Sequence, residues 1–330
     1  MASTQRPSSH SAQAASLATI FTLFLSLAAS KARATTWDEP WADKVIKGAS
    51  SFVLAKVTAT DPAKGISILV TKTLAGEPLK GPILVNGFYL LSLCSRSGDG
   101  LEFEVNKTDS CYFFLYRNDK GQYCIATPTA GFDYVYGEQV GATYRHTYHK
   151  AAVPLEVYER TMTAIFNNYH GLPYDKEYIQ QFVKRQLDQK PSPLNAEGAP
   201  LFFLQHAALE CIYHLRLAAG EDLVYPFLND TANFHNQVSA ARALVAFNTP
   251  RSKAALMQVI GDSARRDFVK VMCIWTLEEF HPADLKPTLQ ALQRSASAEE
   301  DGFGGNIMDP RVCTHLPTVK DALGELIAKL

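Results

Sequence analysis

Three residues that can bind a metal ion or transfer a proton recur at four-residue spacing: His206, Glu210 and His214. In a helix this spacing places the three side chains on one face, and two histidines with a carboxylate can hold zinc. Apolar residues occupy the other side of the same segment, so the pattern indicates the solvent-exposed stripe of an amphipathic helix. We therefore expect no metal ion at this stripe.

The surrounding sequence adds no obvious metal ligand to the stripe. The positions 32 residues further on hold Val238, Arg242 and Ala246, which we also expect to be exposed. His146 and His149 have the spacing of half a metal site, but no paired cysteine or carboxylate motif lies near them. One alternative therefore stays open, a metal-dependent hydrolase that uses either His146 and His149 or the stripe.

The sequence motifs of nucleophilic catalysis are absent. Neither G-x-S-x-G nor H-E-x-x-H occurs, and the glycine-rich stretch 302–305 lacks the Lys-Ser/Thr of a phosphate-binding loop. We assign no catalytic residue, no cofactor-binding residue, no metal ligand and no cofactor. The sequence favours a protein that binds over one that catalyses.

Residues 1–34 have the pattern of a secretory signal peptide. Arg6 lies in a polar start, residues 14–29 are apolar and uncharged, and an Ala-Arg-Ala cleavage site occupies 32–34. The apolar run is short for a membrane span. We expect a secreted or periplasmic protein that, if this segment is cleaved, is not integral to the membrane.

The charge balance argues against a nucleic-acid partner. Without its first 34 residues the chain has 29 basic and 33 acidic residues, a net charge of −4, and it has no basic tail. Proteins that bind nucleic acid present a positive surface to the phosphates. We expect a protein or peptide as the partner.

Residues 199–294 repeat a helix–turn–helix pattern with a period of 31 or 32 residues. The clearest copy is 238–262, in which Leu244 belongs to the first apolar stripe and Pro250 begins the second helix. The unit resembles the short HEAT-like repeat at Ala241, Ala243, Leu244, Pro250, Leu256, Ile260 and Asp262. The resemblance implies a short α-α solenoid, in which stacked pairs bury each other's apolar faces.

Short segments of alternating polarity precede the repeats. Residues 51–60, 65–74 and 83–85 read as strands, and 111–127 reads as a hairpin with its turn at 118–121. If Arg117 pairs with Gln122 in this hairpin, Cys124 lies opposite Leu115. Strands at this spacing predict a small antiparallel β-barrel.

The segment 51–131 resembles the netrin-like, metalloproteinase-inhibitor-like OB barrel of secreted proteins. The resemblance rests on the step from Leu74 to Gly76, on the strand YFFLY after Cys111, and on the DKGQY hairpin. The inhibitors chelate the zinc of the protease with a cysteine at the mature N-terminus, whereas this mature chain would begin at Thr35. Protease inhibition is therefore not implied.

The fold class predicted is α+β and multidomain, an OB-like barrel followed by a solenoid of HEAT-like repeats. Residues 1–34 are the signal peptide and 35–150 the β domain. Residues 151–198 hold two bridging helices and a linker at 189–200, and 199–330 form the helical repeat domain with a terminal capping helix.

The six cysteines of an exported chain suggest disulfides. Cys94 and Cys111 flank one loop, and a bridge between them would close about 17 residues. Cys124 is a strand-core residue or a competitor for either of these. Cys211 and Cys273 lie on first helices two repeats apart, roughly 20 Å, so we expect them to be free and buried.

Three classes of function are compatible with these features. We expect a non-enzymatic module that binds a protein or peptide, through the concave face of the solenoid or the surface of the barrel. The alternatives are the metal-dependent hydrolase described above and a structural protein of the cell envelope.

Cleavage after Ala34 gives the first prediction. Because the apolar run ends at a small-x-small site, the exported protein should begin at or near Thr35. Intact-mass spectrometry of the exported fraction measures this directly. A bulk product that retains Met1 would instead make the segment an uncleaved anchor.

Overall fold

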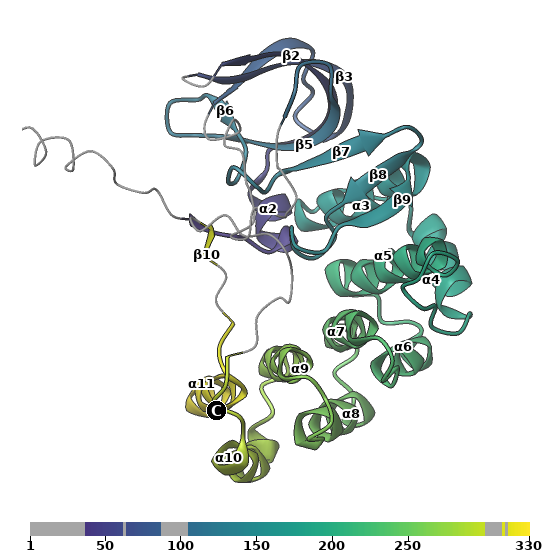
Figure 1. Ribbon diagram of the computed structural model, residues 1–330, viewed down its shortest axis with the longest axis vertical. Helices are drawn as coiled ribbons and strands as arrows, with labels where there is room; N and C mark the ends of the chain where they lie inside the picture. The colour runs from purple at the N-terminus through teal and green to yellow at the C-terminus, as the bar shows by residue number, and fades with distance from the viewer. Residues whose placement is uncertain (1–36, 62–63, 87–104, 301–311, 314–315) are drawn as a thin grey trace, which may run out of the picture. The chain divides into compact units, whose positions relative to one another are not determined.

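Strands occupy the first part of the chain and helices the second (Figure 1). The structure is a computed structural model that describes residues 37–61, 64–86, 105–300, 312–313 and 316–330. Among the described residues no helix is both long and apolar enough to span a membrane. The predicted α+β class, with a small barrel followed by packed helices, is confirmed.

Five strands form the barrel: β2 (Ser51–Asp61), β3 (Gly65–Gly76), β4 (Gly81–Asn86), β5 (Ser110–Arg117) and β6 (Tyr123–Cys124). They are ordered β2-β3-β4-β6-β5, and β2 pairs with β5 to close the barrel. The prediction of a purely antiparallel barrel is wrong at one place, because β4 and β6 run parallel. This strand order is that of an OB-like barrel.

The barrel strands form where buried and exposed residues alternate. On β2, Val53, Ala55 and Val57 are fully buried, and Lys56 between them is exposed. The predicted register of the β5–β6 hairpin is wrong by one residue, since Cys124 lies opposite Tyr116. The turn at 118–121 is tightened by Asn118, whose side chain accepts hydrogen bonds from the backbone of residues 120 and 122.

Three further strands extend the sheet beyond β5: β7 (Phe132–Tyr136), β8 (Gln139–Ala142) and β9 (Ala151–Pro154). None of these three strands was predicted from the sequence. Two short strands, β1 (Trp37–Asp38) and β10 (Val312–Cys313), complete the described strands. The segment between β8 and β9 carries both His146 and His149.

Two helices adjoin the sheet, α2 (Ala42–Gly48) and α3 (Leu155–Tyr169), and α4 (Lys176–Leu187) packs on helix α5 (Ala199–Leu215). Helix α3 packs on β3, β8 and β9 on one side and on α5 on the other. The ion pair of Lys72 on β3 with Glu159 on α3 (2.6 Å) adds to this contact. The two predicted bridging helices are therefore present, with α4 passing the chain to the helical stack.

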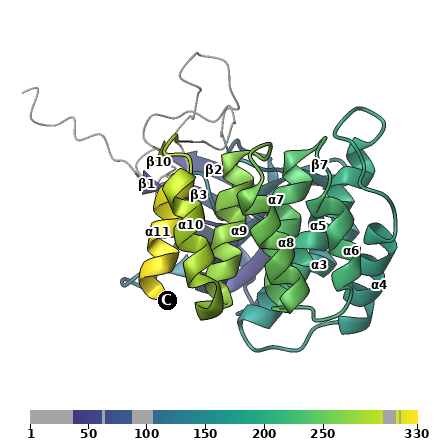
Figure 2. The same ribbon diagram turned by 90° about the horizontal axis from the view of Figure 1, so that it is seen from below.

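The remaining helices stack in two rows (Figures 1 and 2). The inner row is α5 (Ala199–Leu215), α7 (Phe234–Ala243), α9 (Asp267–Glu279) and α11 (Val319–Lys329), each packed on the next. The outer row is α6 (Glu221–Leu228), α8 (Pro250–Gly261) and α10 (Lys286–Ser295), with short 3-10 turns η1 (Leu244–Ala246) and η2 (Ala283–Leu285) before the last two. These pairs match the predicted repeat.

The start of α8 shows how the repeat is punctuated. Thr249 caps the helix by accepting a hydrogen bond from the backbone of Ser252, whose own side chain accepts from the backbone of Thr249. Pro250 occupies the first turn, where its missing N–H costs nothing. The predicted role of Pro250 is confirmed.

The predicted linker at 189–200 contains irregular backbone held against α5. Gln205 of α5 donates to the carbonyls of Gln186 and Lys190 (3.2 and 2.9 Å) and accepts from the backbone of Ser192 (2.8 Å). Gln205 is fully buried. One side chain thus fixes the course of the chain between α4 and α5.

Cysteines form no disulfide among the described residues. Cys111 is a buried thiol of β5, and Cys94 lies outside the described residues, so their predicted pairing stays a prediction. Cys211 and Cys273 are free and buried, as predicted. Burial raises the pKa of both thiols.

Leu244 provides a test of the helical core. It is fully buried at the end of α7, so Leu244→Asp places an unpaired carboxylate in apolar surroundings and should destabilise the protein by several kcal/mol. Urea unfolding measures the loss. Ala254→Asp, on the exposed side of α8, is the matched control and should change little. Equal stability of the two variants would contradict this packing.

Candidate functional site

The segment 143–150, between β8 and β9, lies against α5 and α7 and builds a buried polar cluster with them. His214 reaches the carbonyl of Tyr144 (2.7 Å), and Arg145 donates to Ser239 of α7 (3.1 Å). His149 lies over the ring of His206, with centroids 4.1 Å apart. We call this set of residues from 143–150, α5 and α7 the buried seam.

The prediction that His206, Glu210 and His214 are exposed is wrong. Their exposed fractions are 1%, 0% and 1%, because 143–150 and α7 cover the face of α5 that carries them. The prediction for the equivalent positions of α7 is wrong as well: Val238 and Arg242 are buried and Ala246 is half-buried. A stripe of polar residues on one face of a helix usually faces solvent. Here the stripe on α5 instead contacts another part of the chain.

Glu210 is the only carboxylate at the centre of the seam among the described residues. Its Oε2 lies 3.2 Å from both Nε and Nη2 of Arg242, and its Oε1 accepts from Ser239 (3.1 Å). A buried carboxylate without such partners would pay a desolvation cost of several kcal/mol. The guanidinium of Arg242 is in turn held between the rings of Trp41 and Tyr213, 5.0 and 3.8 Å from their centroids.

Ser239 and His206 resemble part of a hydrolytic triad, but their hydrogen bonds run in the wrong direction. The single hydroxyl proton of Ser239 goes to Glu210, so His206 Nδ1, 2.9 Å away, must donate to Ser239 Oγ. A general base would have to accept the serine proton instead. Ser239 is 1% exposed. This serine is a structural hydroxyl that is not activated for attack.

His214 and His146 also have assigned tautomers. A backbone carbonyl only accepts, so His214 donates from Nε2 to Tyr144 O and accepts at Nδ1 from the hydroxyl of Tyr169 (2.6 Å). His146 Nε2 likewise faces the carbonyl of Glu39 (3.3 Å), and its Nδ1 accepts from the backbone of Tyr148 (3.4 Å). Both rings are neutral in this arrangement.

A fifth histidine, which the sequence did not single out, joins the seam. His235 of α7 lies with its ring centroid 5.1 Å from that of His149. His149 Nδ1, His206 Nε2 and His235 Nδ1 are buried and have no hydrogen-bond partner in the described part of the chain. Even so, no group of three or more metal-ligating side chains among the described residues is arranged to hold a metal ion. The residues of the hydrolase alternative are thus brought together as packed neutral rings.

Burial and two neighbouring guanidinium groups keep the histidines neutral. Burial lowers the pKa of His146 to about 3 and those of His214 and His235 to about 4. Burial also holds the pKa values of His149 and His206 well below the ordinary 6.5, and the charge of Arg145 lowers them further. Near neutral pH these five histidines are therefore uncharged, and the charged groups closest to them include the guanidinium groups of Arg145 and Arg242.

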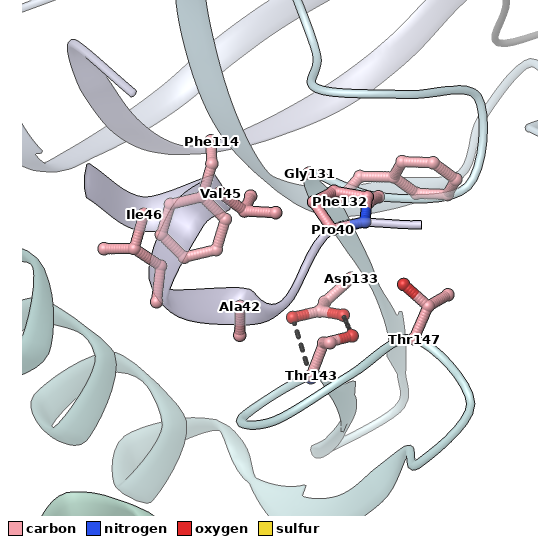
Figure 3. Close-up of a pocket in the computed structure, with 11 residues that line it drawn as sticks. Pro40, Ala42, Val45, Ile46, Phe114, Gly131, Phe132, Asp133, Thr143 and Thr147 are labelled. Carbon is pink, nitrogen blue, oxygen red and sulfur yellow. Dashed lines mark hydrogen bonds between the residues drawn. The ribbon is translucent and has the colours of Figure 1, made fainter. Parts of the chain in front are cut away.

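A small cavity beside α2 is too small to be a ligand site (Figure 3). Its volume is about 10 Å³, room for a single water molecule at most. Asp133 of β7 lies at its edge and is fully satisfied by the backbone and hydroxyl of Thr143, by Tyr158 (2.7 Å) and by Lys150 (2.7 Å). This carboxylate joins β7, the segment 143–150 and α3.

The larger hollows lie where α4 faces the turn between α5 and α6. Two adjoining pockets of about 720 and 430 Å³ share Gln180, Leu217 and Ala218 in their linings. Together they form one groove, which we call the α4 groove. One wall is the stripe Lys176, Gln180 and Lys184 on α4, followed by Asp188 at its C-cap. The other is mainly apolar, with Leu215, Leu217, Ala218, Ala219 and Leu223 beside Arg216.

The α4 groove exists because the chain turns with small residues at its edge. Arg216 ends α5 in the left-handed region (φ 51°), and Gly220 begins α6 there too (φ 92°). Between them stand Leu217, Ala218 and Ala219, of which the two alanines leave space beside α4. The helix–turn–helix repeat predicted over 199–294 requires a turn within each copy, but it predicts neither the conformation of this turn nor its contact with α4.

A third pocket, of about 430 Å³, lies between Leu194 and His235. Its polar groups are already used within the chain. Asp230 accepts from the backbone of Ala232 and the side chain of Asn236 (3.1 and 2.8 Å), and Asn233 accepts from the backbone of His235 (3.0 Å). In the α4 groove, by contrast, neither Lys176 nor Lys184 pairs with a carboxylate of the described chain.

Comparisons with known proteins identify no relative of this chain. No protein-family model matches the chain, and no curated protein or solved structure is detectably similar to it.

The seam makes stability depend on pH. In the unfolded chain the histidines have pKa values near 6.5 and bind protons below that pH, whereas in the folded protein His214 and His235 resist protonation down to about pH 4. The unfolded state therefore binds more protons, and stability falls as the pH drops from 6.5 to 4. We expect a loss of at least about 2 kcal/mol between pH 7.5 and 5.

Urea unfolding across this pH range measures the effect. His235→Gln should flatten the profile, because it removes one histidine that the folded state keeps neutral. Gln258→Asn, at an exposed position of α8, removes no titratable group; it is the control and should leave the slope unchanged. A wild-type protein equally stable at pH 5 and 7.5 would show that the seam is not closed.

Proposed function

We propose that the protein is an exported, non-enzymatic module that binds a segment of another protein, or a peptide, in the α4 groove. The observation that carries this proposal is the length of the groove. Its α4 wall runs from Lys176 to Asp188, about 18 Å along the helix axis. This matches about three turns of a helix or five to six residues of extended chain, and is long for a small metabolite.

The chemistry of the groove also suits a polypeptide. One wall offers aliphatic surface and the other offers polar side chains, which is how grooves that accept an amphipathic helix are built. Leu172, at one end of the groove, is 45% exposed. A leucine left this exposed beside further apolar side chains supports a surface that another chain covers.

The burial of the seam argues for binding over catalysis. The histidines and Glu210 that the hydrolase alternative would need are closed off by 143–150 and α7, and His206 and Ser239 are 1% exposed. A substrate would reach them only after the strand part and the helices separated. The same burial removes the face of α5 and α7 as a docking site, which supports the outer groove in its place.

The predicted location and the two family resemblances of the sequence agree with this proposal. The signal-peptide pattern of residues 1–34 supports export, to the periplasm or the exterior. The resemblances to HEAT-like repeats and to netrin-like OB barrels both belong to modules that bind proteins. We propose both family resemblances together with the function.

The surface of the barrel is the competing site. Leu69 on β3 and Leu84 on β4 are 41% and 43% exposed, and the register of the two strands places them diagonally on the outer face. Two leucines make a smaller apolar surface than the groove offers. Their substitution nevertheless separates the two sites experimentally.

A binding selection tests the proposal. Peptides selected from a displayed library on the purified protein should bind saturably, and Ala218→Trp, which fills the groove at an exposed turn position, should weaken binding at least about tenfold. Ala254→Trp on α8 is the matched control, because it adds the same ring at an exposed site elsewhere. Isothermal titration measures both.

Two outcomes would contradict the groove as the site. Binding that survives Ala218→Trp but is lost in the double variant Leu69→Ser, Leu84→Ser would move the site to the barrel. A failure to select any saturable binder would favour the structural envelope protein.

A further inference from the structure

The α4 wall of the groove carries two lysines and one aspartate, so its charge is positive along most of its length. Lys176, Gln180 and Lys184 follow each other at four-residue intervals on one face of α4, and Asp188 stands at the end of the stripe. Arg216 on the opposite side is partly occupied, 3.5 Å from Glu279. Among the described groove residues the two lysines are the cations without a carboxylate partner, and Arg216 is a third cation at the edge of the groove.

Neither lysine is neutralised by the protein itself. Lys176 contacts the ring of Tyr174 at 5.9 Å, and neither ammonium pairs with a carboxylate within the described ranges. Both residues are exposed. By comparison, the exposed Arg160 of α3 is paired with Asp175, the residue before α4, at 2.9 Å. The groove thus keeps two positive charges, about 12 Å apart along the helix axis, beside an apolar wall.

We infer that the α4 groove takes an acidic amphipathic helix, with leucine-like side chains toward Leu217–Leu223 and carboxylates toward Lys176 and Lys184. This inference rests on the proposed function and names the partner's chemistry. Carboxylates seven or eight residues apart on one face of a helix span the same distance as the two lysines. The position beside Asp188 must hold a neutral or basic residue, since a third carboxylate there meets a like charge.

The arrangement also gives the ligand a direction. The lysines lie toward the start of α4 and Asp188 at its end, so the acidic end of the bound helix lies beside Lys176. The apolar wall extends further toward Asp188, through Ala219 and Leu223. A ligand that is acidic at one end and apolar throughout one face therefore fits in one orientation only.

Three synthetic helical peptides test the inference by fluorescence anisotropy. All carry the same leucine face, and their polar positions facing Lys176 and Lys184 hold glutamate, glutamine or lysine. The glutamate peptide should bind wild type about three- to tenfold more tightly than the glutamine peptide, and the lysine peptide more weakly still. Its advantage should shrink between 50 and about 300 mM salt, because exposed charges are screened.

A charge swap provides the decisive comparison. In Lys176→Glu, Lys184→Glu the order should invert, so that the lysine peptide binds best. Lys56→Glu, Lys120→Glu changes the net charge equally at exposed barrel positions and should keep the wild-type order. Inversion in the first variant alone supports the inference.

The outcomes separate the inference from the proposed function. If all three peptides bind equally and Ala218→Trp abolishes their binding, the groove binds peptides without charge selection and the inference is wrong. If none binds, or if Ala218→Trp leaves the affinities unchanged, the groove is not the peptide site and both proposals are wrong.

Discussion

Where the strands and the helices of this protein meet, the contact is organised by one buried carboxylate. Glu210 has no access to solvent, so its charge must be balanced by protein groups, and Arg242 and Ser239 of α7 do so. Arg145 then binds the same serine from the strand side. Removing either partner of such a pair leaves a buried charge and costs about 3–5 kcal/mol. The relative placement of α5, α7 and 143–150 is therefore set by polar bonds as much as by apolar packing.

This closure determines where a partner can bind. A solenoid of helix pairs usually offers its inner row as a binding surface, but here residues of the strand part occupy that row at α5, α7 and α9, as the contact of Trp41 with Trp275 shows. The end of the helical stack at α4 remains available to a partner. There α4 covers α5 and α6 incompletely, because Ala218 and Ala219 have too little side chain to fill the turn. The α4 groove is thus a consequence of capping the stack with a helix against a small-residue turn.

Local patterns predicted the repeat well and the site poorly, for physical reasons. Leu244 and Pro250 depend on the pattern of their own helices, so the period of the repeat and the helix boundaries could be predicted from the sequence. The burial of His206 and Glu210 depends on 143–150, sixty residues earlier, and no local pattern distinguishes a polar face that meets solvent from one that meets a polar loop. Strand β9 was missed because four residues before a helix carry little periodicity. The groove was missed because its walls, α4 and the α5–α6 turn, are brought together only by the tertiary fold.

The charge near the groove and the net charge of the whole chain have opposite signs, and the difference affects how the groove would bind an acidic partner. Without its first 34 residues the chain has a net charge of −4, which by itself would repel an acidic partner at long range. At physiological ionic strength, however, charges more than about 8 Å apart are largely screened, so a partner in the groove responds mainly to the nearest groups. Those are Lys176 and Lys184, neither of which is paired within the described chain. The acidic helix that we propose as the partner would therefore be held by short-range contacts on a surface of net negative charge, which would favour binding at the groove over non-specific attraction elsewhere.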